Sequence, residues 1–120
     1  MRYLWVGLGG AAGSIARYAI SLNVDQSHLP WATLGINLSG AFILGAFLTL
    51  ALGHLSVAVM TPIAVGVLGG YTTFSTFAWE GFTLGRTGRT GTAIVYVAVS
   101  VVGGLLAASG GYAVGRALRW

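Results

Sequence analysis

The sequence contains no cysteine and no lysine, and only two of its 120 residues are acidic. The absence of cysteine excludes disulfide bonds and thiolate metal sites. Charged residues make up 7% of the chain, whereas soluble domains carry about 25%. Because 56% of the residues are hydrophobic, the composition predicts a membrane protein. The length predicts a single domain over residues 1–120.

The net charge of +4 comes from six arginines and two acids. The arginines stand at the ends of apolar runs, which favours anchoring at lipid headgroups over binding of nucleic acid. The apolar run after Met1 and Arg2 is interpreted as a span rather than a cleaved signal peptide, because Arg17 and Tyr18 follow at once.

Four apolar segments predict an all-α membrane domain, because a spanning helix needs about 20 apolar residues. They cover roughly residues 3–22, 31–53, 57–84 and 92–117. His54 and Ser56 lie in the tight turn expected between the second and third segments. We expect Arg116, Arg119 and Trp120 to anchor the last span at the membrane interface.

The arginines give no clear preference for one orientation in the membrane. Four spans place both termini and the turn at His54 on the same side. That side carries Arg2, Arg116 and Arg119, and the other carries Arg86, Arg89 and Arg17. Two interpretations remain open: the chain inserts in one orientation through a weak bias, or in both, so that opposite copies pair as an antiparallel homodimer.

Many of the twenty glycines recur four residues apart, on one face of a helix. Examples are the pairs Gly9/Gly13, Gly66/Gly70 and Gly111/Gly115. This spacing lets neighbouring helix backbones approach closely, so helix packing is the main interpretation. The surplus of small faces also indicates an oligomer.

Residues 69–77, with the sequence GGYTTFSTF, interrupt the third apolar segment with hydroxyls, aromatics and a glycine pair. Hydrocarbon cannot satisfy a broken backbone, so such a break is buried in protein or lines a wet cavity. The segment therefore predicts a permeation path or an ion site. Carbonyls freed by the break, such as those of Gly69 and Thr72, can coordinate a cation.

Phe74 and Phe77 lie three residues apart within the break, where phenyl rings ordinarily serve packing. The alternative is that their positive ring edges attract a small anion. Asn37 lies inside the second span. Its amide either forms an interhelical hydrogen bond, worth about 1 kcal/mol in membranes, or donates to an anion.

Four further side chains have two interpretations each. Tyr96 and Ser100 share a helix face, which predicts a hydroxyl-lined track, although a tyrosine near an interface is usually an anchor. Glu80 is the only acid within a span and is either functional or interfacial. Arg17 either extends to the headgroups or is a structural partner for the broken helix or for Asp25. No set of residues predicts an enzyme, because the two histidines lie in separate loops.

Three segments together resemble one known family. They are residues 9–13 with Arg17-Tyr18, residues 33–42 (TLGINLSGAF), and residues 69–77 with Glu80. The chain resembles the Fluc/CrcB fluoride channels nearly end to end, and the third segment is the most specific.

The resemblance implies passive fluoride export across the plasma membrane by a dual-topology antiparallel homodimer with two pores. By this resemblance Phe74 and Phe77 are anion ligands and Asn37 donates to fluoride. The polar track would comprise Ser75, Thr76, Tyr96 and Ser100, with a glycine, Gly104, where a further hydroxyl is expected. The carbonyls of Gly69 and Thr72 would hold a structural sodium ion, and Arg17 and Glu80 would be structural or vestibule residues.

Two other functions remain as alternatives. A small drug or cation exporter would also have four spans and dual topology, but that class resembles a pump driven by a glutamate in the first span, which this chain lacks. A non-transporting assembly protein would explain the glycines but not the break with its hydroxyls and phenyl rings.

Overall fold

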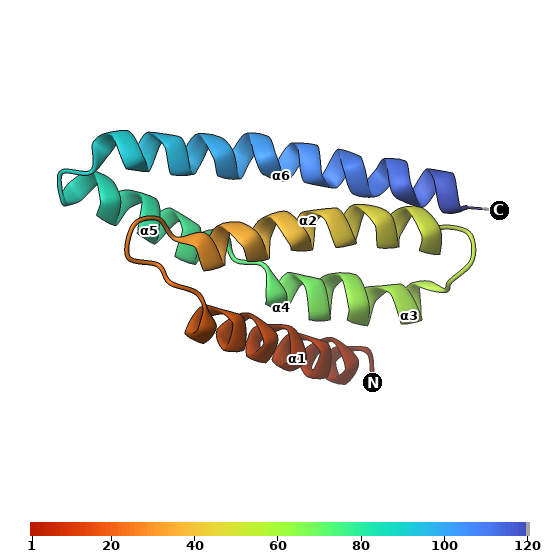
Figure 1. Ribbon diagram of the computed structural model, residues 1–120. Helices are drawn as coiled ribbons and strands as arrows, with labels where there is room; N and C mark the ends of the chain where they lie inside the picture. The colour runs from red at the N-terminus through yellow and green to blue at the C-terminus, as the bar shows by residue number, and fades with distance from the viewer. Residues whose placement is uncertain (120) are drawn as a thin grey trace.

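The computed structural model describes residues 1–119, which are helical and contain no strand (Figure 1). The predicted anchoring role of Trp120 lies outside the described residues. The helices are α1 (Arg2–Asn23), α2 (Trp31–Ala51), α3 (Val57–Thr61), the π-helix η1 (Pro62–Leu68), α4 (Gly69–Tyr71), α5 (Phe74–Arg86) and α6 (Thr90–Leu118).

These helices occupy the four segments that the sequence indicates, with shifted ends. The third segment is divided among α3, η1, α4 and α5. The second helix ends at Ala51 rather than at residue 53, because Gly53 has a φ of 85°, which turns the chain. At the opposite end of the molecule the Arg89 guanidinium donates to the His28 carbonyl and so joins the two loops found there.

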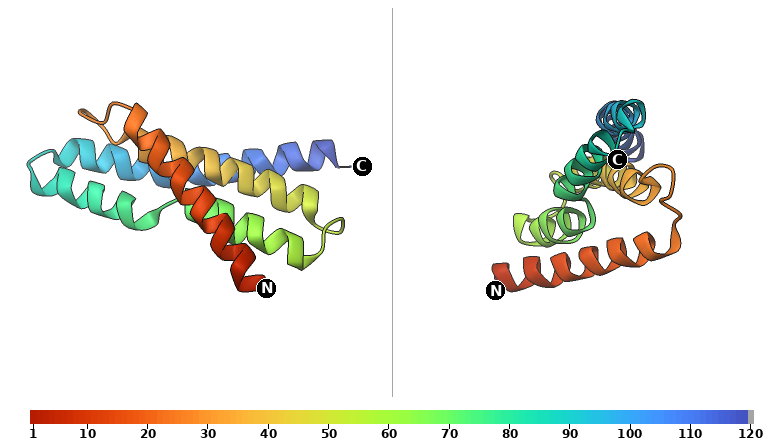
Figure 2. Two further views of the ribbon diagram at one scale, coloured as in Figure 1. Left: turned by 90° about the horizontal axis from the view of Figure 1, so that it is seen from below. Right: turned by 90° about the vertical axis from the view of Figure 1, so that its left-hand side faces the viewer.

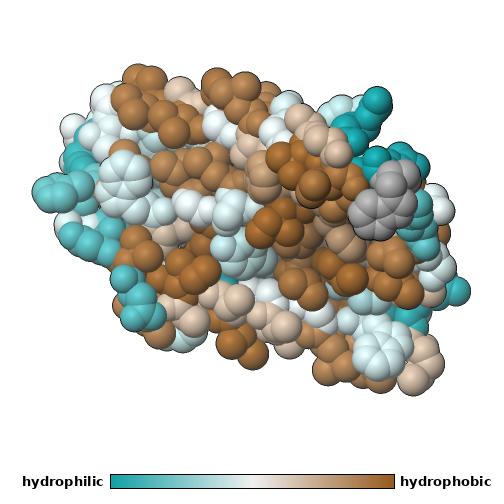
Figure 3. Space-filling model, turned by 45° about the vertical axis from the view of Figure 1, so that its right-hand side comes forward, coloured by the Kyte–Doolittle hydropathy of each residue, from teal (hydrophilic) through white to brown (hydrophobic). Residues whose placement is uncertain are grey.

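Three helical stretches of the described chain are long and apolar enough to cross a membrane: Trp31–Ala51, Val57–Arg86 and Thr90–Leu118. Helix α1 has 22 residues, a length of about 33 Å at 1.5 Å per residue, but it is not among them. In Figure 3 hydrophilic residues gather toward the two ends of the molecule and apolar residues dominate between them. This distribution is typical of a protein that spans a bilayer.

Glycines set the packing of α1 on the third segment. A Cβ on Gly13 would collide with the Val67 carbonyl, and one on Gly70 would lie 2.6 Å from the Gly10 carbonyl. The backbones of α1, η1 and α4 are therefore in direct contact, as the small-residue spacing predicts. Figure 2 shows that α1 runs obliquely across the other helices.

Helices α2 and α6 pack along each other in the same way (Figure 1). A Cβ on Gly111 would collide with the Phe42 carbonyl, and one on Gly115 would lie 2.7 Å from Thr49 Cβ. Where α5 meets this pair, Leu34, Leu84, Ala93 and Tyr96 form the buried core. This cluster thus joins the starts of α2 and α6 to the last turns of α5.

Candidate functional site

The third segment is broken at Thr72 and Thr73. Both are extended, with φ/ψ of −81°/157° and −149°/118°. The break has local causes: glycines at 69 and 70 disfavour helix, and the Thr73 hydroxyl accepts a hydrogen bond from the Thr76 N–H at 3.2 Å, which starts α5 as an N-cap. The predicted break is confirmed, and it is narrower than residues 69–77, because the chain becomes helical again at Phe74.

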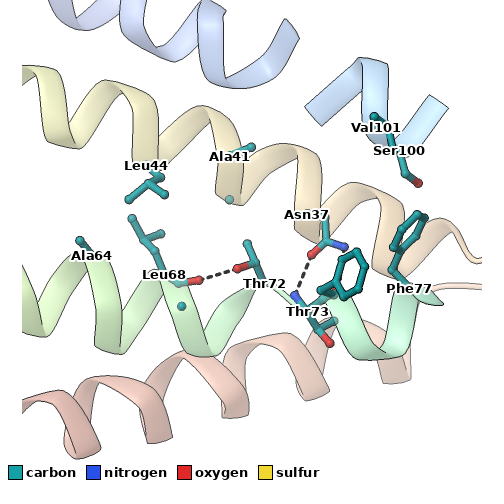
Figure 4. Close-up of a pocket in the computed structure, with 13 residues that line it drawn as sticks. Asn37, Ala41, Leu44, Ala64, Leu68, Thr72, Thr73, Phe77, Ser100 and Val101 are labelled. Carbon is teal, nitrogen blue, oxygen red and sulfur yellow. Dashed lines mark hydrogen bonds between the residues drawn. The ribbon is translucent and has the colours of Figure 1, made fainter. Parts of the chain in front are cut away.

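Helix α2 holds the break from one side. The Asn37 amide donates to the Thr73 carbonyl at 3.0 Å and accepts from the Thr73 N–H at 2.8 Å (Figure 4). One helical turn later, Gly40 provides the space for the Thr72 methyl group, with which a Cβ would collide. The amide of Asn37 thus replaces the acceptor that the Thr73 N–H loses at the break, and one of its two N–H donors remains available.

Helix α1 holds the break from the other side. Arg17 Nε donates to the Gly70 carbonyl at 3.2 Å, and Ser14 Oγ donates to the same oxygen at 3.4 Å. Of the two interpretations of Arg17, this contact matches a partner for the broken helix. The side chain spreads positive charge over the C-terminal end of α4, where helix carbonyls are unpaired.

The Gly69 and Thr72 carbonyls both lose their helical donors at the break. The Thr73 N–H, which a continuous helix would donate to Gly69, donates to Asn37 instead. The Thr76 N–H, which would reach Thr72, donates to the Thr73 hydroxyl. Carbonyl oxygens freed in this way are suitable ligands for a hard cation. In the described chain no cluster of three His, Cys, Asp or Glu residues offers another metal site.

A cavity of about 390 Å³ lies beside the break, between α2, η1, α4, α5 and α6. We call it the break cavity (Figure 4). Six of the predicted site residues line it: Asn37, Gly69, Thr72, Phe74, Phe77 and Ser100. The rest of the lining is mainly apolar, with Ala41, Leu44, Ala64, Leu68 and Val101. The walls therefore offer few polar groups, all near the break.

The two phenylalanines line the cavity in different settings. Phe77 is partly buried, and its ring centroid lies 5.3 Å from that of Tyr96 and 5.8 Å from that of Phe74. Phe74 is 79% exposed. The Phe77 ring is therefore positioned by its own chain, whereas the Phe74 ring projects from it.

The predicted hydroxyls are not all brought to the cavity. Ser100 Oγ is buried in its wall and has no hydrogen-bond partner within residues 1–119. Ser75 is exposed, 3.5 Å from the Thr73 hydroxyl, and Thr76 is partly buried. Neither lines the break cavity, and nor does Tyr96, which is completely buried behind Phe77. Of the predicted track, Ser100 alone lines this cavity.

Glu80 lies one helical turn beyond Phe77 and is held inside the protein. Thr33 Oγ1 donates to Glu80 Oε1 at 2.6 Å, and the Tyr96 hydroxyl donates to Oε2 at 3.5 Å. Glu80 also lines a neighbouring cavity of about 340 Å³ with Gln26, Pro30, Trp79, Thr83 and Leu84. A carboxylate with two hydroxyl donors is oriented rather than free.

Sequence reasoning did not identify Thr33 or Gly40 as site residues. Thr33 and Asn37 are four residues apart, and Asn37 and Gly40 three apart, so all three share one face of α2. Their helical spacing from Asn37 is the sequence signal that could have identified Thr33 and Gly40.

Comparison with known proteins gives a consistent result over nearly the whole chain. Residues 4–112 match a family described as "CrcB-like protein, Camphor Resistance (CrcB)". A protein of Thermus thermophilus named fluoride-specific ion channel FluC is 46% identical, over 98% of this chain and 95% of its own length. Proteins named fluoride-specific ion channel FluC from Acidobacterium capsulatum and FluC 2 from Moorella thermoacetica are 40% and 43% identical, over 97% and 90% of this chain. They are covered over 97% and 91% of their own lengths.

Proposed function

Since the chain belongs to the CrcB family, we propose that it is a fluoride-selective channel that exports fluoride passively across the plasma membrane. It is a multi-pass membrane protein and not an enzyme. The names of its relatives indicate that the ion is fluoride, and the break cavity is the candidate route for it.

The observation that carries this proposal is the polar character of one wall of an otherwise apolar cavity. The buried Ser100 hydroxyl has no partner within the described chain, and Asn37 keeps one N–H donor after its two bonds to Thr73. Buried donors without partners are costly. An anion that accepts hydrogen bonds from both would offset that cost.

The phenyl rings add an electrostatic contribution at the same place. The positive edges of Phe74 and Phe77 attract a small anion and offer no acceptor oxygen to a cation. Ser75, Thr76 and Tyr96 continue the passage outside the break cavity in this proposal, and Glu80 lies in a vestibule. Fluoride then exchanges its hydration shell for a few donors and ring edges.

A structural cation fits the freed carbonyls of Gly69 and Thr72. The family resemblance suggests sodium, and the donor set of neutral oxygens suits such a hard monovalent ion. The cation would offset the negative ends of these carbonyls and hold the break in shape. The role of Arg17 at the Gly70 carbonyl is structural in the same sense.

The active unit is an antiparallel homodimer of four-span subunits, with a pore on each side of its two-fold axis. The exposed Phe74 ring supports this assembly, because the single chain leaves one side of that anion ligand uncovered. Helix α1 is the fourth span, tilted so that its backbone contacts η1 and α4. The near-equal numbers of arginines at the two ends support insertion in both orientations.

Efflux from liposomes tests the function directly. Purified protein is reconstituted into liposomes loaded with potassium fluoride, and release is followed with a fluoride electrode without a proton gradient. Rapid release of fluoride and retention of chloride are expected. A drug or cation exporter would require a proton gradient and would release no fluoride. Absence of fluoride release in this assay would therefore exclude a fluoride channel.

Substitutions in the cavity test the site. Phe74→Ile and Asn37→Ala are expected to reduce fluoride efflux by about tenfold or more, since losing about 1.4 kcal/mol of stabilisation has this effect. Both variants should still run as dimers in size-exclusion chromatography. Ser21→Ala is the matched control, because that hydroxyl bonds only the nearby Tyr18 carbonyl on α1. Efflux at the unsubstituted rate in both cavity variants would refute the site.

A further inference from the structure

A third cavity, of about 310 Å³, lies where the ends of α2 and α6 meet the turn at residues 52–56. We call it the C-terminal cavity. Apolar side chains form most of its lining: Phe47, Leu50, Ala51, Leu55 and Leu118. Its two polar lining residues are His54 and Arg119. It shares no residue with the break cavity.

Arg119 lies at this cavity, and most of its N–H donors make no hydrogen bond within the described chain. Its Nη2 atom donates to the Leu52 carbonyl at 3.0 Å, just beyond the end of α2. A guanidinium has five N–H donors, so most remain for another group. Arg116 lies one turn earlier on α6, 5.9 Å from the centre of the Tyr112 ring, and adds positive charge at this end.

No acidic side chain lies at this end of the described chain to neutralise this charge. The two acidic residues of the sequence are Asp25, in the loop after α1, and Glu80, in α5. Both belong to the half of the molecule away from the C-terminus (Figure 1). Neither acidic side chain of the sequence therefore neutralises Arg119 within the single chain.

We infer that the C-terminal cavity binds one anionic phospholipid. An acyl chain lies against the apolar lining, and the phosphate lies at the rim on Arg119 and His54. The ends of spanning helices lie at the level of the headgroups, where basic pockets recognise anionic lipids. Arginine matches phosphate through paired N–H bonds. A soluble anion would satisfy the guanidinium but would not use the apolar lining.

Lipid retention tests the inference. The full-length protein is exchanged into detergent with equal amounts of phosphatidylglycerol and phosphatidylcholine of matched acyl chains, and retained lipid is counted by native mass spectrometry. About tenfold preference for phosphatidylglycerol is expected, because both lipids offer a phosphate to Arg119 but the choline cation of phosphatidylcholine cancels its charge and is repelled by the basic residues at this end. Arg119→Gln should abolish the preference, and Arg86→Gln, at the end of α5, should leave it intact. Equal loss in both variants, or no preference, would overturn the inference.

Further arms distinguish other occupants. Leu55→Trp should reduce retention of both lipids by filling the cavity, and glycerol phosphate should not compete; full competition by it would mean a site for soluble anions only. A preference that arises only in Asp25→Asn would mean that the acid of a second copy neutralises Arg119. A preference that arises only after deletion of residue 120 would mean that the chain fills its own cavity. Each of these last three results would contradict the binding of an anionic phospholipid in the C-terminal cavity.

Discussion

At the scale of single residues, the hydrogen bonds around the break separate side chains that are satisfied from those that are not. Asn37 uses its amide oxygen and one of its two N–H donors on Thr73, and Glu80 accepts from Thr33 and Tyr96. Ser100 has no partner in the described chain. Substitutions can therefore distinguish side chains that bind the backbone from side chains that are available to a ligand.

Replacing Ser100 separates function from stability. In Ser100→Ala no hydrogen bond of the chain is lost, and the cost of a buried unpaired hydroxyl, about 1–3 kcal/mol, is removed. The melting temperature is expected to stay the same or rise, while fluoride efflux falls about tenfold. Thermal melts in detergent and liposome efflux measure the two effects. A fall in melting temperature with normal efflux would mean that the hydroxyl serves packing.

The sequence indicated most of these residues but not their partners. A buried asparagine in an apolar helix is visible in the sequence, and so are hydroxyls four residues apart. Whether Asn37 faces Thr73 or an open cavity depends on how α2 is rotated, which packing with α6 decides. The same rotation brings Thr33 to Glu80, a pairing across 47 positions of sequence.

At the scale of helices, the four apolar segments and the break could be predicted, because length and glycine content are local properties. The π-helix η1 could not be predicted from the sequence. Its seven residues lie directly against α1, and π-helical turns form where tertiary contacts accommodate them, frequently at functional sites. The sequence-based prediction also treated α1, which contains two arginines and four glycines, in the same way as the three stretches that are long and apolar enough to span.

Two glycines of α1 provide a matched test of helix packing. A methyl group at Gly13 would collide with the Val67 carbonyl, whereas nothing lies within 4 Å of a Cβ at Gly7. Gly13→Ala is expected to destabilise the protein by about 1–3 kcal/mol. Gly7→Ala should be neutral or stabilise it by up to about 1 kcal/mol, because alanine favours helix. Thermal melts of both variants check this, and equal effects would contradict the packing of α1 on η1.

At the scale of the whole molecule, the arginines are divided evenly between the two ends. Beyond the membrane-facing surface, Arg86 and Arg89 lie at one end and Arg116 and Arg119 at the other. Such a balance leaves insertion without a strong directional preference. The proposed antiparallel dimer depends on this property.

Because the chain has no cysteine, single cysteines can report orientation. Ser27→Cys lies in the loop before α2 and Ser56→Cys in the turn before α3, at opposite ends of the molecule. In intact cells an impermeant thiol reagent is expected to label about half of each variant, as insertion in both directions requires. Labelling of one variant alone would show a single orientation and exclude the antiparallel dimer.

The oblique path of α1 has a mechanical consequence. Its backbone touches the backbone of α4 at Gly10 and Gly70 with no side chain between them, and Arg17 fastens it to the same residue. A tilted span changes its angle when the bilayer becomes thinner or thicker. If α1 is the fourth span as proposed, any such rotation pushes directly on the peptide beside the proposed ion passage. Ion throughput should therefore vary with acyl-chain length, as efflux from liposomes of graded thickness would reveal.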